Sequence, residues 1–203
     1  MNAAAVALVA LGLGVVVVRR RSLATALVAL QGLVLGVAAL AQGGDGGAMS
    51  VAGAILLVRA AAIPLLLLVA RRRTPEPTLV APTTSVATRL VIATAVVLVA
   101  VAATPPLGLA DRAAEHGSVA LVCLGIATVA VRRPALLQVL GILVAENGVY
   151  LLAIAVSGGV PAAVELGVLF DLVLVVTVAT AFAAKIHQRV GSGDTDLLRG
   201  LRD

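Results

Sequence analysis

Long apolar segments, separated by short stretches that hold nearly all of the arginines, dominate this sequence. Seven of these segments are predicted to be helices, and they cover residues 3–18, 22–41, 51–70, 90–104, 117–131, 134–156 and 160–184. A helix of about 20 residues is long enough to cross the ~30 Å hydrocarbon core of a bilayer. The strands of a membrane barrel would alternate polar and apolar residues, which these segments do not. The sequence therefore predicts an all-α, polytopic integral membrane protein with seven transmembrane helices.

The composition excludes an ordinary soluble protein and shows no sign of chemistry within the chain. Hydrophobic residues make up 61% of the 203 residues and charged residues 12%, whereas soluble domains are about 25% charged. Cys123 is the single cysteine and lies in an apolar segment, and the two histidines do not have the spacing of metal ligands. No motif for phosphate, haem, flavin or an iron–sulfur centre is present. We therefore expect no cofactor, no metal, no catalytic residue and no nucleic-acid partner, and the bilayer as the surroundings of the chain.

The positions of the basic residues predict the orientation of the chain. If the N-terminus lies outside the cell, all but two of the 15 Lys and Arg residues fall in cytoplasmic segments. The two exceptions are Arg112, in an external loop, and Arg59, within the third apolar segment. Because cytoplasmic loops of membrane proteins are enriched in Lys and Arg, this distribution predicts a multi-pass protein of the cell inner membrane with a cytoplasmic C-terminus.

A Pro- and Thr-rich stretch divides the chain. Residues 1–73 are predicted to form an N-terminal three-helix segment, and residues 74–88 a cytoplasmic linker without a helix of its own. Residues 89–189 are predicted to form a four-helix membrane segment, followed by a cytoplasmic tail at residues 190–203.

Three carboxylic acids lie within the last two apolar segments. They are Glu146 in the sixth, with Asn147 beside it and Tyr150 one helical turn later, and Glu165 and Asp171 in the seventh. A carboxylate in hydrocarbon costs at least a few kcal/mol unless it is paired, protonated or hydrated. Two interpretations account for such residues: an internal path for a proton or cation, or protonated acids whose hydrogen bonds join helices. We favour the path, with Tyr150 and Asn147 as supporting groups.

Arg59 is the natural counter-charge for one of these acids. A guanidinium group within hydrocarbon is expected to find a carboxylate or water. The sequence leaves open which acid pairs with it, and the alternative is an off-centre arginine that extends to the membrane surface.

The polar pattern of the last two segments resembles a known family, the membrane subunit hydrogenase-4 component E. The resemblance is carried by the run GILVAENGVYLLAIAVSGGVPAAVELGVLFDLVLVV, and the last segments are more distantly similar to the K-type subunit of complex I and its counterpart in multisubunit cation/proton antiporters. This resemblance implies that Glu146 is the first acid of a proton path and that Asp171 or Glu165 is the second. Arg59 matches no motif of the family.

The resemblance further implies a membrane subunit of a hydrogenase-type or complex I-like respiratory assembly. Its partners would be larger antiporter-like and hydrogenase-type membrane subunits, and the redox centres would belong to those partners. The sequence leaves open whether H⁺ or Na⁺ moves. Two alternatives from other classes are a stand-alone small transporter and a structural scaffold subunit without a role in the ion path.

Overall fold

The computed structural model describes residues 2–42, 48–73 and 85–156, except residues 107, 110 and 133. The helices in this part of the chain are α1 (Asn2–Val17), α2 (Arg21–Gln42), α3 (Ala48–Arg73), α4 (Val86–Ala103), α5 (Arg112–Val131) and α6 (Ala135–Ala155). No strand occurs within these ranges, so the all-α prediction is confirmed for them. Four of the helices, α2, α4, α5 and α6, are long and apolar enough to cross a membrane, while α1 and the apolar stretch Ser50–Ala62 of α3 are shorter.

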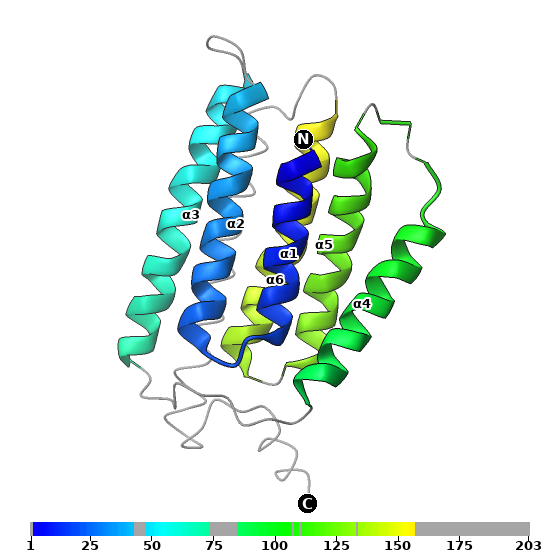
Figure 1. Ribbon diagram of the computed structural model, residues 1–203. Helices are drawn as coiled ribbons and strands as arrows, with labels where there is room; N and C mark the ends of the chain where they lie inside the picture. Colours follow the sequence, from blue (N-terminus) through cyan, green and yellow to red (C-terminus); the bar gives the residue numbers. More distant parts are fainter. Residues whose placement is uncertain are drawn as a thin grey trace, which may run out of the picture.

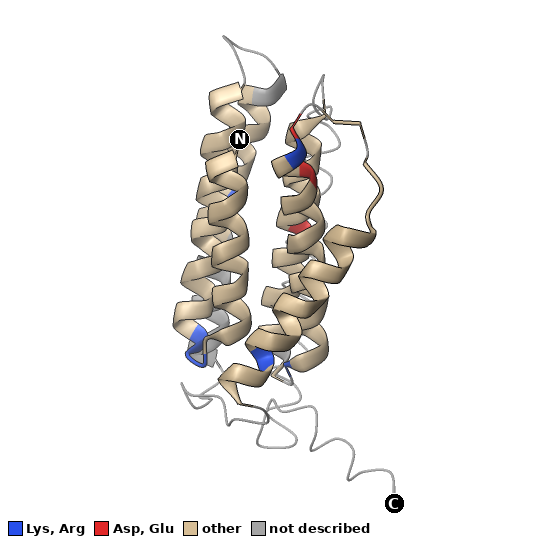
Figure 2. Cartoon of the chain, turned by 45° about the vertical axis from the view of Figure 1, so that its right-hand side comes forward, with Lys and Arg blue, Asp and Glu red and all other residues tan. Residues whose placement is uncertain are grey.

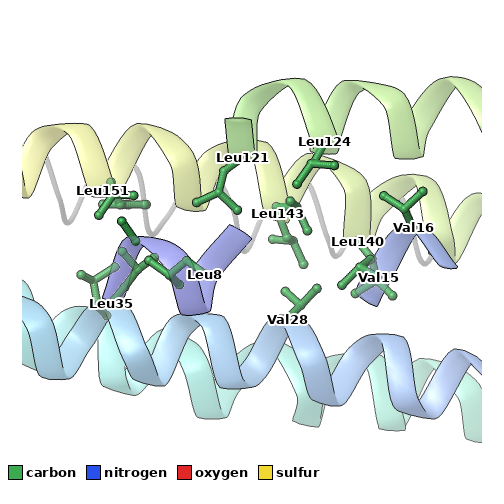
Figure 3. Packing of buried hydrophobic residues seen from close by; sticks show 14 of the residues in the cluster. Leu8, Val15, Val16, Val28, Leu35, Leu121, Leu124, Leu140, Leu143 and Leu151 are labelled. Atoms are coloured by element: carbon green, nitrogen blue, oxygen red, sulfur yellow. The ribbon is translucent and has the colours of Figure 1, made fainter. Parts of the chain in front are cut away.

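The helices form an antiparallel bundle in which α1 holds a central place (Figure 1). Helix α1 contacts α2, α4, α5 and α6, while α3 packs against α2 and α4 against α5. Leucines form much of the core, among them Leu8, Leu121, Leu124, Leu143 and Leu151 (Figure 3). Arg59 and Glu146 therefore belong to different parts of the bundle: Arg59 to the pair α2–α3, and Glu146 to the pair α5–α6.

Glycines allow very close contact within each of these two helix pairs. Between α5 and α6, a Cβ atom added at Gly125 would lie 2.5 Å from the Gly141 carbonyl oxygen, and one at Gly148 would lie 2.7 Å from the Ser118 carbonyl oxygen. Between α2 and α3, a Cβ at Gly53 would lie 3.0 Å from the carbonyl oxygen of Gly36. Helix association in a membrane relies on such small residues, because lipid tails are as apolar as the helix surfaces.

Replacing Gly148 by leucine is expected to separate α5 from α6. The new side chain would meet the α5 backbone, which cannot rotate away, so we expect a loss of about 3 kcal/mol or more. Unfolding of the purified chain by SDS in mixed micelles measures this change. Val149→Leu, at a neighbouring exposed position, is the matched control, and equal stability of the two variants would contradict the packing described here.

Two predicted helix boundaries are corrected by capping residues. Helix α5 begins at Arg112 and not at residue 117, because the Asp111 side chain accepts hydrogen bonds from the backbone N–H groups of Ala113 and Ala114 at 3.0 and 3.1 Å. The residues Glu115 and His116, which the sequence placed in a polar loop, therefore lie in α5.

Helix α4 likewise starts earlier than residue 90. The Ser85 hydroxyl accepts a hydrogen bond from the Thr88 N–H at 3.0 Å, and the helix starts at Val86, within the last residues of the predicted linker. The rest of that linker, the seventh apolar segment and the tail lie outside the described residues, so the count of seven spans stays a prediction.

Candidate functional site: a buried ion pair between two helix pairs

An ion pair joins α3 to α6 inside the bundle. The Arg59 Nη2 atom lies 2.9 Å from Glu146 Oε2, and the two side chains are 4% and 16% exposed. Both residues lie near the middle of their helices. The structure thus supplies what the sequence left open: among the acids it describes, Glu146 is the one that Arg59 reaches.

Tyr150 adds a second contact to the guanidinium group. The Arg59 Cζ atom lies 4.8 Å from the centre of the Tyr150 ring, within the range of a cation–π interaction. Because Tyr150 follows Glu146 by four residues, both side chains leave α6 on the same face. Both the carboxylate of Glu146 and the aromatic ring of Tyr150 therefore contact the guanidinium group and fix its position.

Buried amides connect the same region of α6 to α2 and α1. Asn147 Nδ2 donates to Gln31 Oε1 at 3.2 Å, and Gln31 Nε2 donates to the Leu8 carbonyl oxygen at 2.8 Å. Gln31 is fully buried midway along α2. Gly12 leaves room for its amide, since a Cβ there would lie 3.3 Å from Gln31 Nε2. These bonds limit the rotation of α6 and so keep Glu146 turned toward α3.

The arrangement can exchange a proton only if the ion pair opens. Each charge on its own would be costly to bury, by several kcal/mol, and the pair is tolerated because the two charges neutralise each other. If Arg59 moved away, the Glu146 carboxylate would have to gain a proton or water. The site therefore has the parts of a proton-loading group: a carboxylic acid and a cation, held on two different helix pairs.

Gln31 and Glu115 are among the buried polar residues that the sequence did not identify as part of a site. Gln31 is a single amide within an apolar segment, and its position there could have indicated a buried hydrogen-bonding residue. Glu115 was assigned to an external loop, but it is buried in α5; the Asp111 cap four residues earlier could have revealed it. Glu165 and Asp171 lie outside the described ranges. In the part of the chain that the structure describes, no three His, Cys, Asp or Glu residues are grouped as metal ligands would be.

Comparison with known proteins finds a family match for the C-terminal part of the chain and one relative that covers nearly all of it. Residues 113–203 match the family NADH-ubiquinone/plastoquinone oxidoreductase chain 4L. This match includes Glu146, Asn147 and Tyr150 but neither Arg59 nor Gln31. The whole chain is similar to the uncharacterized protein Rv0085 of Mycobacterium tuberculosis, with 31% identity over 199 residues that cover 93% of this chain and 90% of that protein.

No solved structure matches the chain. The similarity to Rv0085 extends over both halves of the sequence, and the apolar helices are those of a multi-pass membrane protein. The chain therefore belongs to the family of Rv0085, and through its C-terminal part it is related to the chain 4L, or K-type, membrane subunits of complex I-like respiratory enzymes.

Proposed function

We propose that this chain is a membrane subunit of a hydrogenase-type or complex I-like assembly and contributes Glu146 to a proton (or cation) path. The observation that carries the proposal is the Arg59–Glu146 ion pair, which lies at mid-helix depth. Its acid belongs to the part of the chain that is similar to chain 4L. The resemblance to hydrogenase-4 component E is the more specific form of the proposal, and Glu165 or Asp171 is its second acid.

The two glycine-packed helix pairs suggest how the path works. Arg59 moves with α2–α3 and Glu146 with α5–α6, so a small shift between the pairs changes the distance between the two charges. Glu146 takes up a proton when Arg59 withdraws and releases it when Arg59 returns. The Asn147–Gln31 hydrogen bond favours the arrangement in which Arg59 and Glu146 are paired. In that arrangement the ring of Tyr150 contacts the guanidinium group.

Gentle purification from the native membrane tests whether the chain acts within an assembly. The proposal predicts that larger antiporter-like and redox subunits co-purify with the tagged full chain. A chain that purifies alone and still moves ions in vesicles would instead be a stand-alone transporter. A chain that co-purifies but is indifferent to neutral changes at Glu146 would be a scaffold.

The basic residues support the proposed orientation. Most of the described Lys and Arg residues gather at the end of the bundle opposite the N-terminus (Figure 2). Reporter fusions after Arg21, Arg73 and Arg133 are expected to report the cytoplasm, as is a fusion at the C-terminus, and fusions near Asp45 and Asp111 the outside. A C-terminus found outside the cell would contradict seven spans.

A further inference from the structure

Helix α4 is buried against the bundle only in its first half. Its buried side chains are Arg89 and Ala93, whereas its later part, which ends at Ala103, is inclined away from α1 and α5 (Figure 1). A cavity of about 500 Å³ lies between these three helices, and the later part of α4 forms one wall through Val97 and Val101. The inclination of α4 therefore leaves a space that the bundle itself does not fill.

The cavity is apolar and as deep as one leaflet of a bilayer. Among its described lining residues, His116 is the one whose side chain has polar atoms, and an apolar cavity does not hold ordered water. Along α1 the lining extends from Ala5 to Leu13, which is ~12 Å at 1.5 Å per residue. Half of the ~30 Å hydrocarbon core is ~15 Å, so the cavity matches the acyl chains of the leaflet at the N-terminal end of the bundle.

A polar hollow continues the cavity at that end. Ala113 and His116 line both spaces, and the other residues that line the hollow include Asn2, Asp111 and Arg112. One acid and one base leave the hollow with little net charge, which favours a headgroup that has no net charge. The imidazole of His116, which is exposed, can donate a hydrogen bond at the boundary between the two spaces.

We propose that one acyl chain of a zwitterionic phospholipid fills this cavity, with its phosphate at His116 and its headgroup in the polar hollow. The cavity volume lies in the range of small-molecule sites, about 300–1,000 Å³. A second copy of this chain or a helix of a partner subunit could cover the apolar walls, but neither accounts for the polar hollow at the end of the cavity. The bound lipid joins the later part of α4 to α1 and α5, and it does so whether or not Glu146 moves ions.

Native mass spectrometry of the purified full chain tests this site. The chain is reconstituted in bilayers of equal parts phosphatidylethanolamine and phosphatidylglycerol and is then released into a mild detergent. We expect one phosphatidylethanolamine molecule to stay bound to each chain. His116→Leu removes the hydrogen-bond donor at an exposed position, and it should weaken binding about fivefold, which corresponds to about 1 kcal/mol.

A cavity-filling variant tests where the lipid is bound. Ala10 is exposed and lines the cavity, so the ring in Ala10→Phe should displace the acyl chain and abolish retention. Ala95→Phe is the matched control, because Ala95 is exposed on α4 but does not line this cavity.

Four results would overturn the proposal. They are equal retention of lipid by the two phenylalanine variants, retention of phosphatidylglycerol alone, and a lipid-free dimer of the unaltered chain, which would show that a second copy covers the cavity. The fourth is unchanged binding in His116→Leu, a variant outside the core that remains informative even if Ala10→Phe fails to fold.

Discussion

Replacing Arg59 by leucine is expected to destabilise the protein by about 3–5 kcal/mol, because it leaves Glu146 as an uncompensated acid inside the bundle. Binding of a proton at Glu146 would reduce this loss of stability in the variant. It would not remove the loss, because the guanidinium contact with Tyr150 is lost as well. Unfolding of the purified full chain in mixed detergent micelles measures the effect.

The neutral double variant Arg59→Leu with Glu146→Gln provides the decisive comparison. It contains no unpaired charge, so it should recover most of the stability that Arg59→Leu loses, and the two changes should be strongly non-additive. Arg112→Leu, at an exposed position, controls for the loss of an arginine as such. If Arg59→Leu is as stable as the unaltered chain, Arg59 reaches the membrane surface and the pairing is wrong.

The helical architecture was predictable because a bilayer imposes a length on each apolar segment. Residues 22–41 correspond closely to α2, and residues 134–156 to α6. The polar residues of these segments were also conspicuous, since each charge in an apolar run needs an explanation. The errors arose at helix starts, where Asp111 and Ser85 extend helices into segments that hydropathy alone assigns to loops.

The contacts of the site could not be predicted from the sequence. Arg59 and Glu146 belong to helices that are far apart in the chain, and which acid meets the arginine depends on the rotation of α3 and α6. That rotation is set by the glycine contacts within each pair and by the Gln31–Asn147 hydrogen bond. A single sequence shows that Gln31 and Asn147 are polar but not that they bond to each other.

Neutralising Glu146 is expected to abolish ion translocation while electron transfer by the enclosing complex continues. Glutamine keeps the size of glutamate and can accept a hydrogen bond, but it carries no exchangeable acidic proton. Glu146→Gln alone leaves Arg59 without its counter-charge, so the neutral double variant is the better form of the test. Asp171→Asn should act in the same direction. Glu165→Gln should act more weakly, because its place in the predicted segment 160–184 is nearer the end that we expect outside.

A scaffold subunit would respond in the opposite way. It would tolerate neutral replacement of Glu146 and Arg59, since packing is retained, and it would fail with Gly148→Leu, which forces α5 and α6 apart. Comparing the neutral double variant with Gly148→Leu in one assembly assay therefore separates loss of the ion path from loss of structure.

The most direct test measures ion uptake in the Arg59→Leu, Glu146→Gln double variant. Sealed vesicles contain the assembled complex, and the ion uptake is normalised to electron transfer. The proposed path predicts normal assembly and electron transfer, with ion uptake reduced to the level of vesicles treated with an ionophore. Full ion uptake per electron in this variant would contradict a role of the Arg59–Glu146 pair in translocation.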